Sequence, residues 1–212
     1  MICELSTFYQ TGRLTAGLIG DYYEFGVWQG NSFAQAFHMI SKADQLAFDI
    51  WKIEKPQFHM FAFDSFEGLP NIEGVDIGGP FSKGDYSCSL ENFNKNIKEW
   101  GVDLKRVVCT KGWYSETLNL ETKNSLKLTK ARIIHIDCDL YDSTKTVLEF
   151  CTNLIQDGTV IVFDDWFQFR GHPFKGEQLA FSEWQENNPK FIATEYMREF
   201  PWKNSFIINE IL

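Results

Sequence analysis

Acidic residues follow two apolar segments of the sequence in a pattern that suits a divalent cation. Asp137 and Asp139 follow the run IIHI, and Asp164 and Asp165 follow the run TVIVF. If these runs form neighbouring parallel strands, their carboxylates meet at one edge of a sheet and repel each other unless a positive charge lies among them. Oxygen ligands of this kind suit Mg²⁺. The alternative is that Asp139 and Asp142 cap the following helix and that only one acid is buried.

A second candidate segment, residues 24–32, has the sequence EFGVWQGNS. A strand that leads into glycines and then a helix lets the backbone approach a ligand, and the start of the helix offers free N–H groups to a carboxylate or phosphate. Ser32 is expected as the helix N-cap. The spacing Gly-x-x-x-Gly differs from that of dinucleotide-binding motifs, so a tight turn that packs the helix on the strand is the alternative reading.

Asp64, in FDSFEGLP, is a third candidate because an acid at the end of a strand can accept two hydrogen bonds from ribose hydroxyls. Its alternative role is to cap a helix or a turn. His135 lies within an apolar run and is expected to be a core residue with satisfied polar atoms. The Cys and His residues lack zinc-site spacing. A nucleophile elbow and a P-loop are also missing from the sequence, which disfavours acyl transfer and nucleotide hydrolysis.

These residues need a sheet to position them, and short apolar runs alternate with helical patterns along the chain. Strands are expected at 21–27, 58–64, 106–110, 133–137 and 159–165, and helices at 32–52, 90–100, 143–155 and 177–186. This alternation indicates a mostly parallel sheet covered on both faces, with four acid-bearing or glycine-bearing strand ends on one rim. The closing strands, 191–196 and 205–209, are only about nine residues apart, which favours an antiparallel pair. Residues 71–85, rich in glycine, are expected to form a surface loop.

Composition limits the remaining function classes. The chain has 212 residues, of which 44% are hydrophobic and 16% aromatic, which suits one domain over residues 1–212 with a packed core. Its net charge of −9 disfavours binding to nucleic acid and to anionic membrane surfaces. No run approaches the roughly 18 apolar residues of a membrane span. Without a secretory signal pattern, the five scattered cysteines indicate reduced thiols and a cytoplasmic protein.

Six segments, in this order and at these spacings, resemble the macrocin-type (TylF-like) O-methyltransferases. They lie between about residues 22 and 184 and read EFGVWQGNS, FDSFEGLP, KGWYSETL, HIDCDLYDST, GTVIVFDDW and FKGEQLAF. The resemblance implies transfer of a methyl group from S-adenosylmethionine, with Mg²⁺, to a hydroxyl of a sugar-containing natural product or another polyhydroxylated small molecule. It also implies the class I methyltransferase (Rossmann-like) fold, a doubly wound α/β sheet of seven strands, mostly parallel with an antiparallel last strand.

The resemblance also assigns roles to individual residues. The residues expected to line the methionine and ribose end of the cofactor, or to contact its ribose, are Glu24, Gly26, Gly30, Ser32, Asp64 and Ser65. Asp137 is expected to border the cofactor and to bind the metal together with Asp164 and Asp165, and Asp139 is expected to be the general base. Catechol-type methyltransferases carry a Lys where this chain has Leu140 and an Asp-Asn pair where it has Asp164-Asp165, so the sugar-type reading is favoured.

The N-terminal part departs from the usual pattern of the family. Members usually carry a longer segment that covers the cofactor and acceptor and contributes to oligomer contacts, whereas residues 1–20 are expected here as a short helical segment. The acceptor lid and the choice between monomer and homodimer are therefore left open. Two other functions also stay open: a Mg²⁺-dependent phosphohydrolase or nucleotide-sugar transferase, and a non-catalytic S-adenosylmethionine-binding module.

Overall fold

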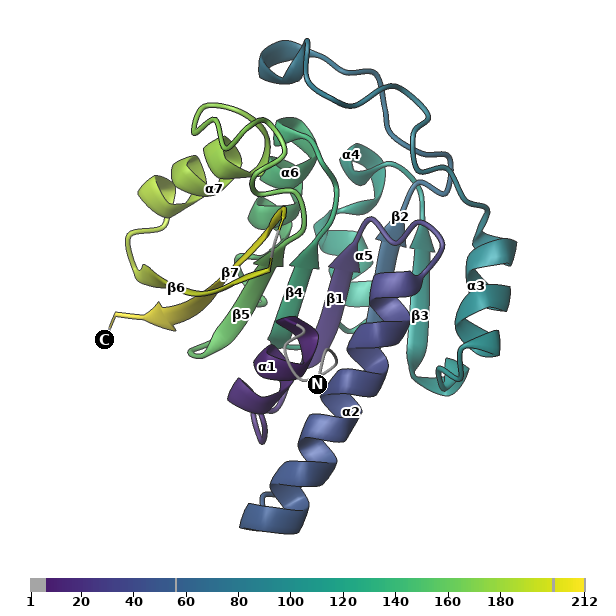
Figure 1. Ribbon diagram of the computed structural model, residues 1–212, viewed down its shortest axis with the longest axis vertical. Coiled ribbons are helices and arrows are strands. Elements are labelled where there is room, and N and C mark those ends of the chain that lie inside the picture. Colours follow the sequence, from purple (N-terminus) through teal and green to yellow (C-terminus); the bar gives the residue numbers. More distant parts are fainter. Residues whose placement is uncertain (1–6, 56, 200, 212) are drawn as a thin grey trace.

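The computed structural model describes residues 7–55, 57–199 and 201–211. Its strands are β1 (Asp21–Phe25), β2 (Met60–Asp64), β3 (Val107–Lys111), β4 (Ala131–Ile136), β5 (Thr159–Phe163), β6 (Phe191–Glu199) and β7 (Lys203–Glu210). They form one sheet in the order β3-β2-β1-β4-β5-β7-β6 (Figure 1). The first five strands pair in parallel, and β7 runs antiparallel to both β5 and β6. The predicted seven-stranded, mostly parallel sheet with an antiparallel last strand is confirmed.

Helices cover both faces of this sheet. They are α1 (Thr7–Leu14), α2 (Asn31–Trp51), α3 (Leu90–Glu99), α4 (Tyr114–Thr117), α5 (Leu120–Ser125), α6 (Tyr141–Cys151) and α7 (Gly176–Asn187). Side chains alternate across a strand, so Tyr22 packs with α1, α2 and α3, whereas Tyr23 packs on the face of α6 and α7. Aromatic rings stack between neighbouring strands, with Tyr23 and Phe61 centroids 5.0 Å apart. Two buried layers thus fix the strands whose ends carry the candidate residues.

The start of α2 differs from the prediction. Its N-cap is Gly30, which adopts φ 92°, and the helix begins at Asn31, so Ser32 is not the N-cap. The hydroxyl of Ser32 instead donates a hydrogen bond to Glu24 Oε1 (2.5 Å). The buried carboxylate of Glu24 therefore binds the hydroxyl of Ser32, which is not used to cap the helix. Helix α1 lies within the expected N-terminal helical segment, of which residues 1–6 lie outside the described part of the chain.

A buried ion pair joins α1, α2 and β4. The guanidinium of Arg132, on β4, donates to both carboxylate oxygens of Asp44 on α2, at 2.8 and 2.6 Å. It also donates to Thr15 Oγ1 (2.7 Å) and to the carbonyl oxygen of Gly12 (2.9 Å). Arg132 and Asp44 are 1% and 4% exposed, so this pair is desolvated and hydrogen-bonded throughout. It fixes the N-terminal helix against the sheet.

The predicted surface loop at 71–85 is anchored across the molecule. It contains the short 3-10 helix η2 (Gly74–Asp76) and extends beyond the carboxyl ends of the strands (Figure 1). Asp76 is 3% exposed, and its two oxygens accept hydrogen bonds from the backbone N–H groups of Tyr141 (2.7 Å) and Gly176 (2.9 Å). These N–H groups lie at the starts of α6 and α7, where helices have unpaired donors. The loop after β2 is therefore fixed to helices on the far side of β1.

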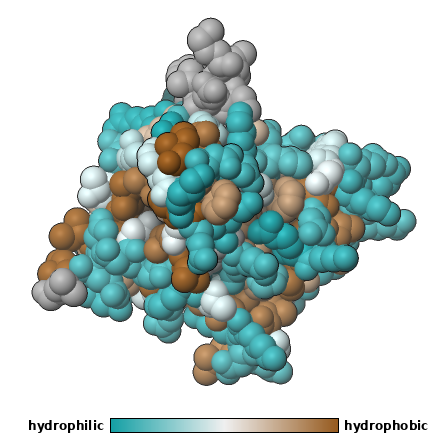
Figure 2. Space-filling model, turned by 90° about the horizontal axis from the view of Figure 1, so that it is seen from below, coloured by the Kyte–Doolittle hydropathy of each residue, from teal (hydrophilic) through white to brown (hydrophobic). Residues whose placement is uncertain are grey.

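In the described part of the chain, no helix combines the length and the apolar character that crossing a bilayer requires. Seen from below, hydrophilic and hydrophobic residues are interspersed over the surface (Figure 2).

Candidate active site at the carboxyl ends of the strands

A cavity of about 670 Å³ lies where the parallel strands end. Its lining includes residues at or just after the ends of strands β1 to β5: Gly26, Asp64, Gly112, Asp137 and Asp164. Open parallel sheets bind ligands at this edge, and the volume is typical of small-molecule sites. The convergence of strand ends on one rim, predicted from the sequence, is therefore found.

Gly26 allows the first and fourth strand ends to approach closely. Its N–H donates to the carbonyl oxygen of Phe63 on β2, and the N–H of Asp137 donates to the carbonyl oxygen of Phe25 on β1, both at 2.9 Å. Gly26 has φ 83°, and a Cβ there would lie 1.7 Å from the carbonyl oxygen of Asp137. Only glycine fits, because any side chain would push Asp137 and the end of β1 apart.

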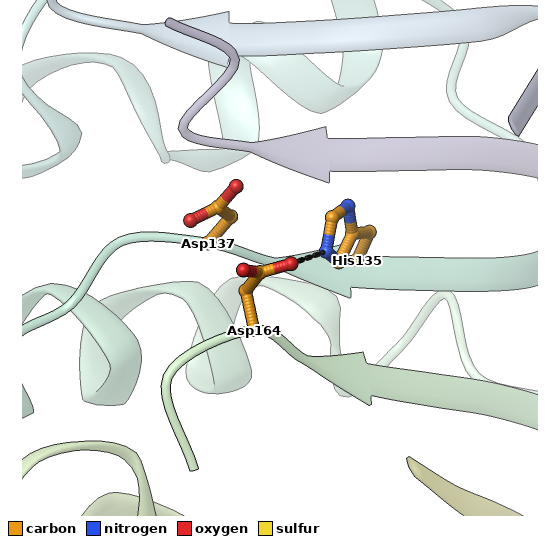
Figure 3. A group of neighbouring side chains, drawn as sticks. All are labelled: His135, Asp137 and Asp164. Carbon is orange, nitrogen blue, oxygen red and sulfur yellow. Dashed lines mark hydrogen bonds and ion pairs between the residues drawn. The ribbon is translucent and has the colours of Figure 1, made fainter. Parts of the chain in front are cut away.

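Asp137 and Asp164 face each other across the ends of β4 and β5, and His135 lies beside them (Figure 3). One ligand atom from each of these three side chains lies within 4.8 Å of the others. His135 is fully buried, and its Nε2 is 3.0 Å from Asp164 Oδ1. Its Nδ1 lies 3.6 Å from Glu24 Oε2, so the ring bridges two carboxylates. The prediction that His135 is a core residue with satisfied polar atoms is confirmed. Its contacts with Glu24 and Asp164 were not predicted.

Charges in this group determine which carboxylates are ionised. Burial lowers the pKa of His135, but the negative charge of Glu24 and the hydrogen bond to Asp164 outweigh it and raise the pKa to about 10. Burial raises the pKa of Asp164, but the hydrogen bond and charge of His135 lower it to about 2. Burial and the charges of Asp164 and Asp165 raise the pKa of Asp137 well above its ordinary value. Imidazolium and carboxylate therefore form an ion pair at neutral pH.

Lys203, at the start of β7, supplies a second cation to Asp164. Its ammonium donates to Asp164 Oδ1, the same oxygen that contacts His135. Burial lowers the pKa of Lys203, but the charge of Asp164 outweighs it and raises the pKa. Both cations thus hold one oxygen of Asp164, which leaves Oδ2 for another partner. Lys203 is distant in sequence, and only the β5–β7 pairing brings it to the site.

Asp139 and Asp165 form a second acidic pair in the cavity. Asp139 is 5% exposed and has φ 62° in the turn between β4 and α6. Burial and the charges of Asp165 and Asp137 raise its pKa well above the ordinary value, and burial and Asp164 raise the pKa of Asp165 to about 6. Asp165 is outside the group within 4.8 Å described above, but it lines the same cavity.

Two buried oxygens beside this pair have no hydrogen-bond partner. They are Asp165 Oδ2 and Glu177 Oε1, while Glu177 Oε2 accepts from the N–H of Asp165 (3.0 Å). Glu177 is 1% exposed, and burial together with the charge of Asp165 raises its pKa well above the ordinary value. Buried carboxylates without donors are costly unless a proton or a cation neutralises them. The carboxylate oxygens of Asp137, Asp164 and Asp165 are hard ligands, so these three residues fit a divalent cation such as Mg²⁺.

At the expected cofactor end, Asp64 holds the backbone as well as lining the cavity. Its Oδ2 accepts from the N–H groups of Val27 (2.8 Å) and Trp28 (3.3 Å), and its Oδ1 accepts from Phe66 N–H (2.6 Å). Ser65 also lines the cavity and donates to the carbonyl oxygen of Gly68 (3.0 Å). Asp64 therefore has the turn-forming role that was its alternative, and its Oδ1, which accepts one of these bonds, keeps a further lone pair.

Three expected cofactor residues, Glu24, Gly30 and Ser32, are outside the cavity lining. Glu24 is fully buried, and its oxygens accept from Ser32 Oγ and from the Tyr22 hydroxyl, both at 2.5 Å. The hydrogen bond from Ser32 to Glu24 joins the start of α2 to β1, and Gly30 is the N-cap of α2, so these residues support the turn rather than line the cavity. Glu24 also pairs in register with His135, so the supporting network continues into the acidic group.

Aromatic residues at the cavity were not predicted individually. Trp28 and Tyr86 contact each other edge to face, with centroids 5.6 Å apart, and are 42% and 48% exposed. Trp113 and Trp202 also line the cavity. The block KGWYSETL could have indicated Trp113, but Tyr86 and Trp202 lie in segments without a motif.

The chain is similar to a known protein family and to curated proteins. The family model described as Macrocin-O-methyltransferase (TylF) matches residues 11–184. A curated relative from Streptomyces olivaceus, 8-demethyl-8-(2,3-dimethoxy-alpha-L-rhamnosyl)-tetracenomycin-C 4'-O-methyltransferase, is 27% identical over 160 residues, which are 72% of this chain and 55% of the relative.

Two solved structures share the fold. The calicheamicin methyltransferase CalS11 has a TM-score of 0.72 at 20% identity, covering 97% of this chain and 79% of that one. The O-methyltransferase NovP has a TM-score of 0.70 at 19% identity, covering 99% and 81%. The chain spans about half the length of the curated relatives it matches. Because the family model covers most of the sequence, this chain belongs to the macrocin-O-methyltransferase (TylF) family.

Proposed function

We propose that this protein transfers a methyl group from S-adenosylmethionine to a hydroxyl of a sugar or another polyhydroxylated small molecule, with Mg²⁺. The observation that carries the proposal is the meeting of Asp137 and Asp164 at two neighbouring strand ends of one cavity. Membership of a family named for O-methyl transfer supports the reaction type. The names of the relatives, which include a rhamnosyl-tetracenomycin methyltransferase, support a sugar hydroxyl as the acceptor.

The cofactor end of the cavity is assigned to the turns after β1 and β2. Gly26, Asp64, Ser65 and Asp137 line the cavity and would contact the cofactor, while Glu24, Gly30 and Ser32 would hold the β1–α2 turn in place. S-adenosylmethionine supplies the methyl group on a sulfonium, which is already a strong electrophile. What the protein must do is bring the acceptor oxygen into line and remove its proton.

The acidic end is assigned to proton removal and metal binding. Asp137, Asp164 and Asp165 would hold Mg²⁺, with Asp164 oriented by His135 and Lys203. Bound Mg²⁺ would lower the pKa of the acceptor hydroxyl and fix its direction. Asp139 lies two positions after Asp137, lines the cavity and would accept the proton as general base. Proton removal by a positioned group contributes about 10²–10⁴-fold in rate.

The test combines binding with turnover. Calorimetry with S-adenosylhomocysteine should show binding by the wild type, and mass spectrometry should detect methylated glycosides that disappear when EDTA removes the metal. Asp139→Asn should retain S-adenosylhomocysteine binding and lose about 10²–10⁴-fold in turnover. Glu149→Gln, at an exposed acid of α6, is the control and should keep both. Failure of the wild type to bind millimolar S-adenosylhomocysteine would contradict the proposal, and unchanged turnover of Asp139→Asn would remove Asp139 as the base.

A further inference from the structure

A second cavity lies at the opposite edge of the sheet from the candidate active site. It has a volume of about 550 Å³, and its lining comes from the middle of α2, from residues 55 and 57–59 before β2, and from the short 3-10 helix η3 (Leu104–Arg106) with the residue before it. Strands β2 and β3 begin here, whereas the first cavity lies where they end (Figure 1). Since a strand rises about 3.3 Å per residue, the five residues of β2 keep the two cavities about 13 Å apart. The volume is that of a small-molecule site.

Arg106 brings unused hydrogen-bond donors to this cavity. Its Nε donates to the carbonyl oxygen of Phe58 (2.9 Å), and its guanidinium carbon lies 3.9 Å from the centre of the Phe58 ring, so the guanidinium plane is fixed. Within the described residues, neither Nη group has a hydrogen-bond or ion-pair partner. Burial lowers the pKa of Arg106, and the charge of Asp103, which raises it, does not outweigh burial. A fixed, half-buried guanidinium of this kind is a ready receptor for an oxyanion.

Two further donors belong to the lining of the same cavity. The ammonium of Lys55 donates to Gln45 Oε1 (2.8 Å) and keeps other N–H groups for a ligand. Ser41 Oγ is buried and has no hydrogen-bond partner among the residues that the structure describes. Buried hydroxyls are normally paired, and a serine within a helix commonly bonds the carbonyl one turn earlier. Because no hydrogen bond holds the Ser41 hydroxyl, a rotation about χ1 is sufficient to turn it toward a ligand.

The charges of the lining allow a ligand with little negative charge. Lys55 and Arg106 are its cations, and Asp44 and Asp103 are its carboxylates. Both oxygens of Asp44 are already taken by Arg132, at 2.8 and 2.6 Å. With Arg132 included, three cations therefore stand against two carboxylates.

His59 and Asp21 complete this balance. His59 belongs to the lining and is charged only when protonated, and its Nδ1 lies 3.5 Å from Asp21 Oδ1. Asp21 is outside the lining and cancels the excess positive charge unless His59 is protonated. The site is thus close to neutral, and it suits one negative charge that is held by directed hydrogen bonds.

We propose that this cavity binds a small molecule through a carboxylate group. The carboxylate would accept two parallel hydrogen bonds from the Nη groups of Arg106, with Lys55 and the rotated Ser41 hydroxyl as further donors. A carboxylate carries the single charge that the lining balances, whereas a phosphate monoester carries nearly two at neutral pH. The two cavities share no lining residue, so this binding site is independent of the proposed methyl transfer.

The experiment compares matched probes on the full chain at low ionic strength. Acetate, pyruvate and benzoate are the carboxylates, benzamide has the shape of benzoate without its charge, and phenyl phosphate carries the higher charge. Backbone amide shifts in heteronuclear NMR give Kd and locate the binding residues. At least one carboxylate should bind, with shifts at residues 41–45, 55–59 and 103–106. We expect benzoate to bind about tenfold more tightly than benzamide and more tightly than phenyl phosphate.

A pair of substitutions tests whether Arg106 is the receptor. Arg106→Gln should weaken carboxylate binding by about tenfold or more, because the parallel hydrogen bonds and the charge are both lost. Lys105→Gln removes the same charge from the neighbouring residue, which is exposed and outside the lining, and should leave Kd unchanged. Both variants should keep the wild-type affinity for S-adenosylhomocysteine. Equal losses of carboxylate binding in the two variants would attribute the binding to net charge and overturn the proposal.

Ser41→Ala tests the site without removing an existing contact. The Ser41 hydroxyl has no partner to lose and alanine favours a helix, so Tm without ligand should not fall. Carboxylate binding should weaken by about two- to tenfold. If Arg106→Gln does not fold, this variant decides: weaker binding at an undiminished Tm supports the site, and unchanged binding overturns it.

Three results from the wild type would also overturn the proposal. They are the absence of shifts with all three carboxylates at millimolar concentrations, shifts confined to the first cavity, and binding of phenyl phosphate as tight as that of benzoate. None of these results bears on methyl transfer, which S-adenosylhomocysteine binding and turnover test separately.

Discussion

Replacement of Gly26 by alanine should break the junction between β1 and β4. The new Cβ would lie 1.7 Å from the carbonyl oxygen of Asp137, a distance that cannot be accommodated without moving backbone. The left-handed φ of 83° adds about 1–2 kcal/mol for any residue with a Cβ. Overpacking typically costs about 1–3 kcal/mol more. The free energy of unfolding should therefore fall by about 2–5 kcal/mol.

Gly84 offers a matched control. It has φ 82°, nearly the same as Gly26, but a Cβ there would meet no atom within 4 Å. Gly84→Ala should therefore show only the backbone cost of about 1–2 kcal/mol. Urea denaturation of both variants measures the difference, which isolates the contact with Asp137. Calorimetry with S-adenosylhomocysteine, at a temperature where both variants are folded, should show weaker binding for Gly26→Ala alone.

The reasoning would be refuted by equal losses of stability in the two variants. That result would mean that β1 and β4 separate at negligible cost, and that the close approach at the strand ends does not position Asp137. Equal binding of S-adenosylhomocysteine by both variants would likewise contradict the placement of the cofactor at this turn.

Three other substitutions test separate parts of the structure. Asp44→Ala should lower the free energy of unfolding, measured by urea denaturation, by about 3–5 kcal/mol, because it leaves the charge of Arg132 buried without its ionic partner. The control Glu210→Ala removes an exposed ion pair with Lys190 and should lower it by under about 1 kcal/mol. Similar losses in the two variants would contradict the role of burial. Asp164→Ala should raise the Kd for Mg²⁺ in calorimetry, and wild-type affinity would remove Asp164 from the ligand set. Asp76→Ala should leave the N–H groups of Tyr141 and Gly176 without an acceptor, which lowers the free energy of unfolding by about 1–3 kcal/mol for each. Amide hydrogen exchange within residues 71–85 should become faster. Unchanged exchange would show that Asp76 does not hold the loop.

The strands were predictable because their signal is local. The runs IIHI and TVIVF are buried on both faces, as near-continuous apolar sequences predict. The short gap between residues 191–196 and 205–209 indicated the antiparallel pair β6–β7. Their acidic ends were therefore brought to one rim as expected. The short helices α4 and α5 were not predicted, since each has too few residues for a periodic pattern.

The contacts within the site depend on pairing between distant segments, and this is what the sequence could not give. His135 contacts Glu24 because the two residues are in register on neighbouring strands, although alternation along β4 already places His135 and Asp137 on one face. Lys203 reaches Asp164 only through the β5–β7 ladder. Ser32 was expected as a cap because its type and position fit, but a buried Glu24 competes for its hydroxyl.

The attachment of Asp76 has a consequence for how molecules enter and leave. Strand β1 separates β2 from β4 in the sheet, so the segment after β2 must pass over this edge to reach the starts of α6 and α7. The carboxylate of Asp76 makes both of these attachments, and Lys175, just before α7, also donates to the carbonyl oxygens of Val75 and Ile77. Release of this crossing segment therefore requires the bonds of Asp76 and of Lys175 to break together. Under the proposed function, this step would limit the departure of a methylated acceptor too large to pass beside the segment.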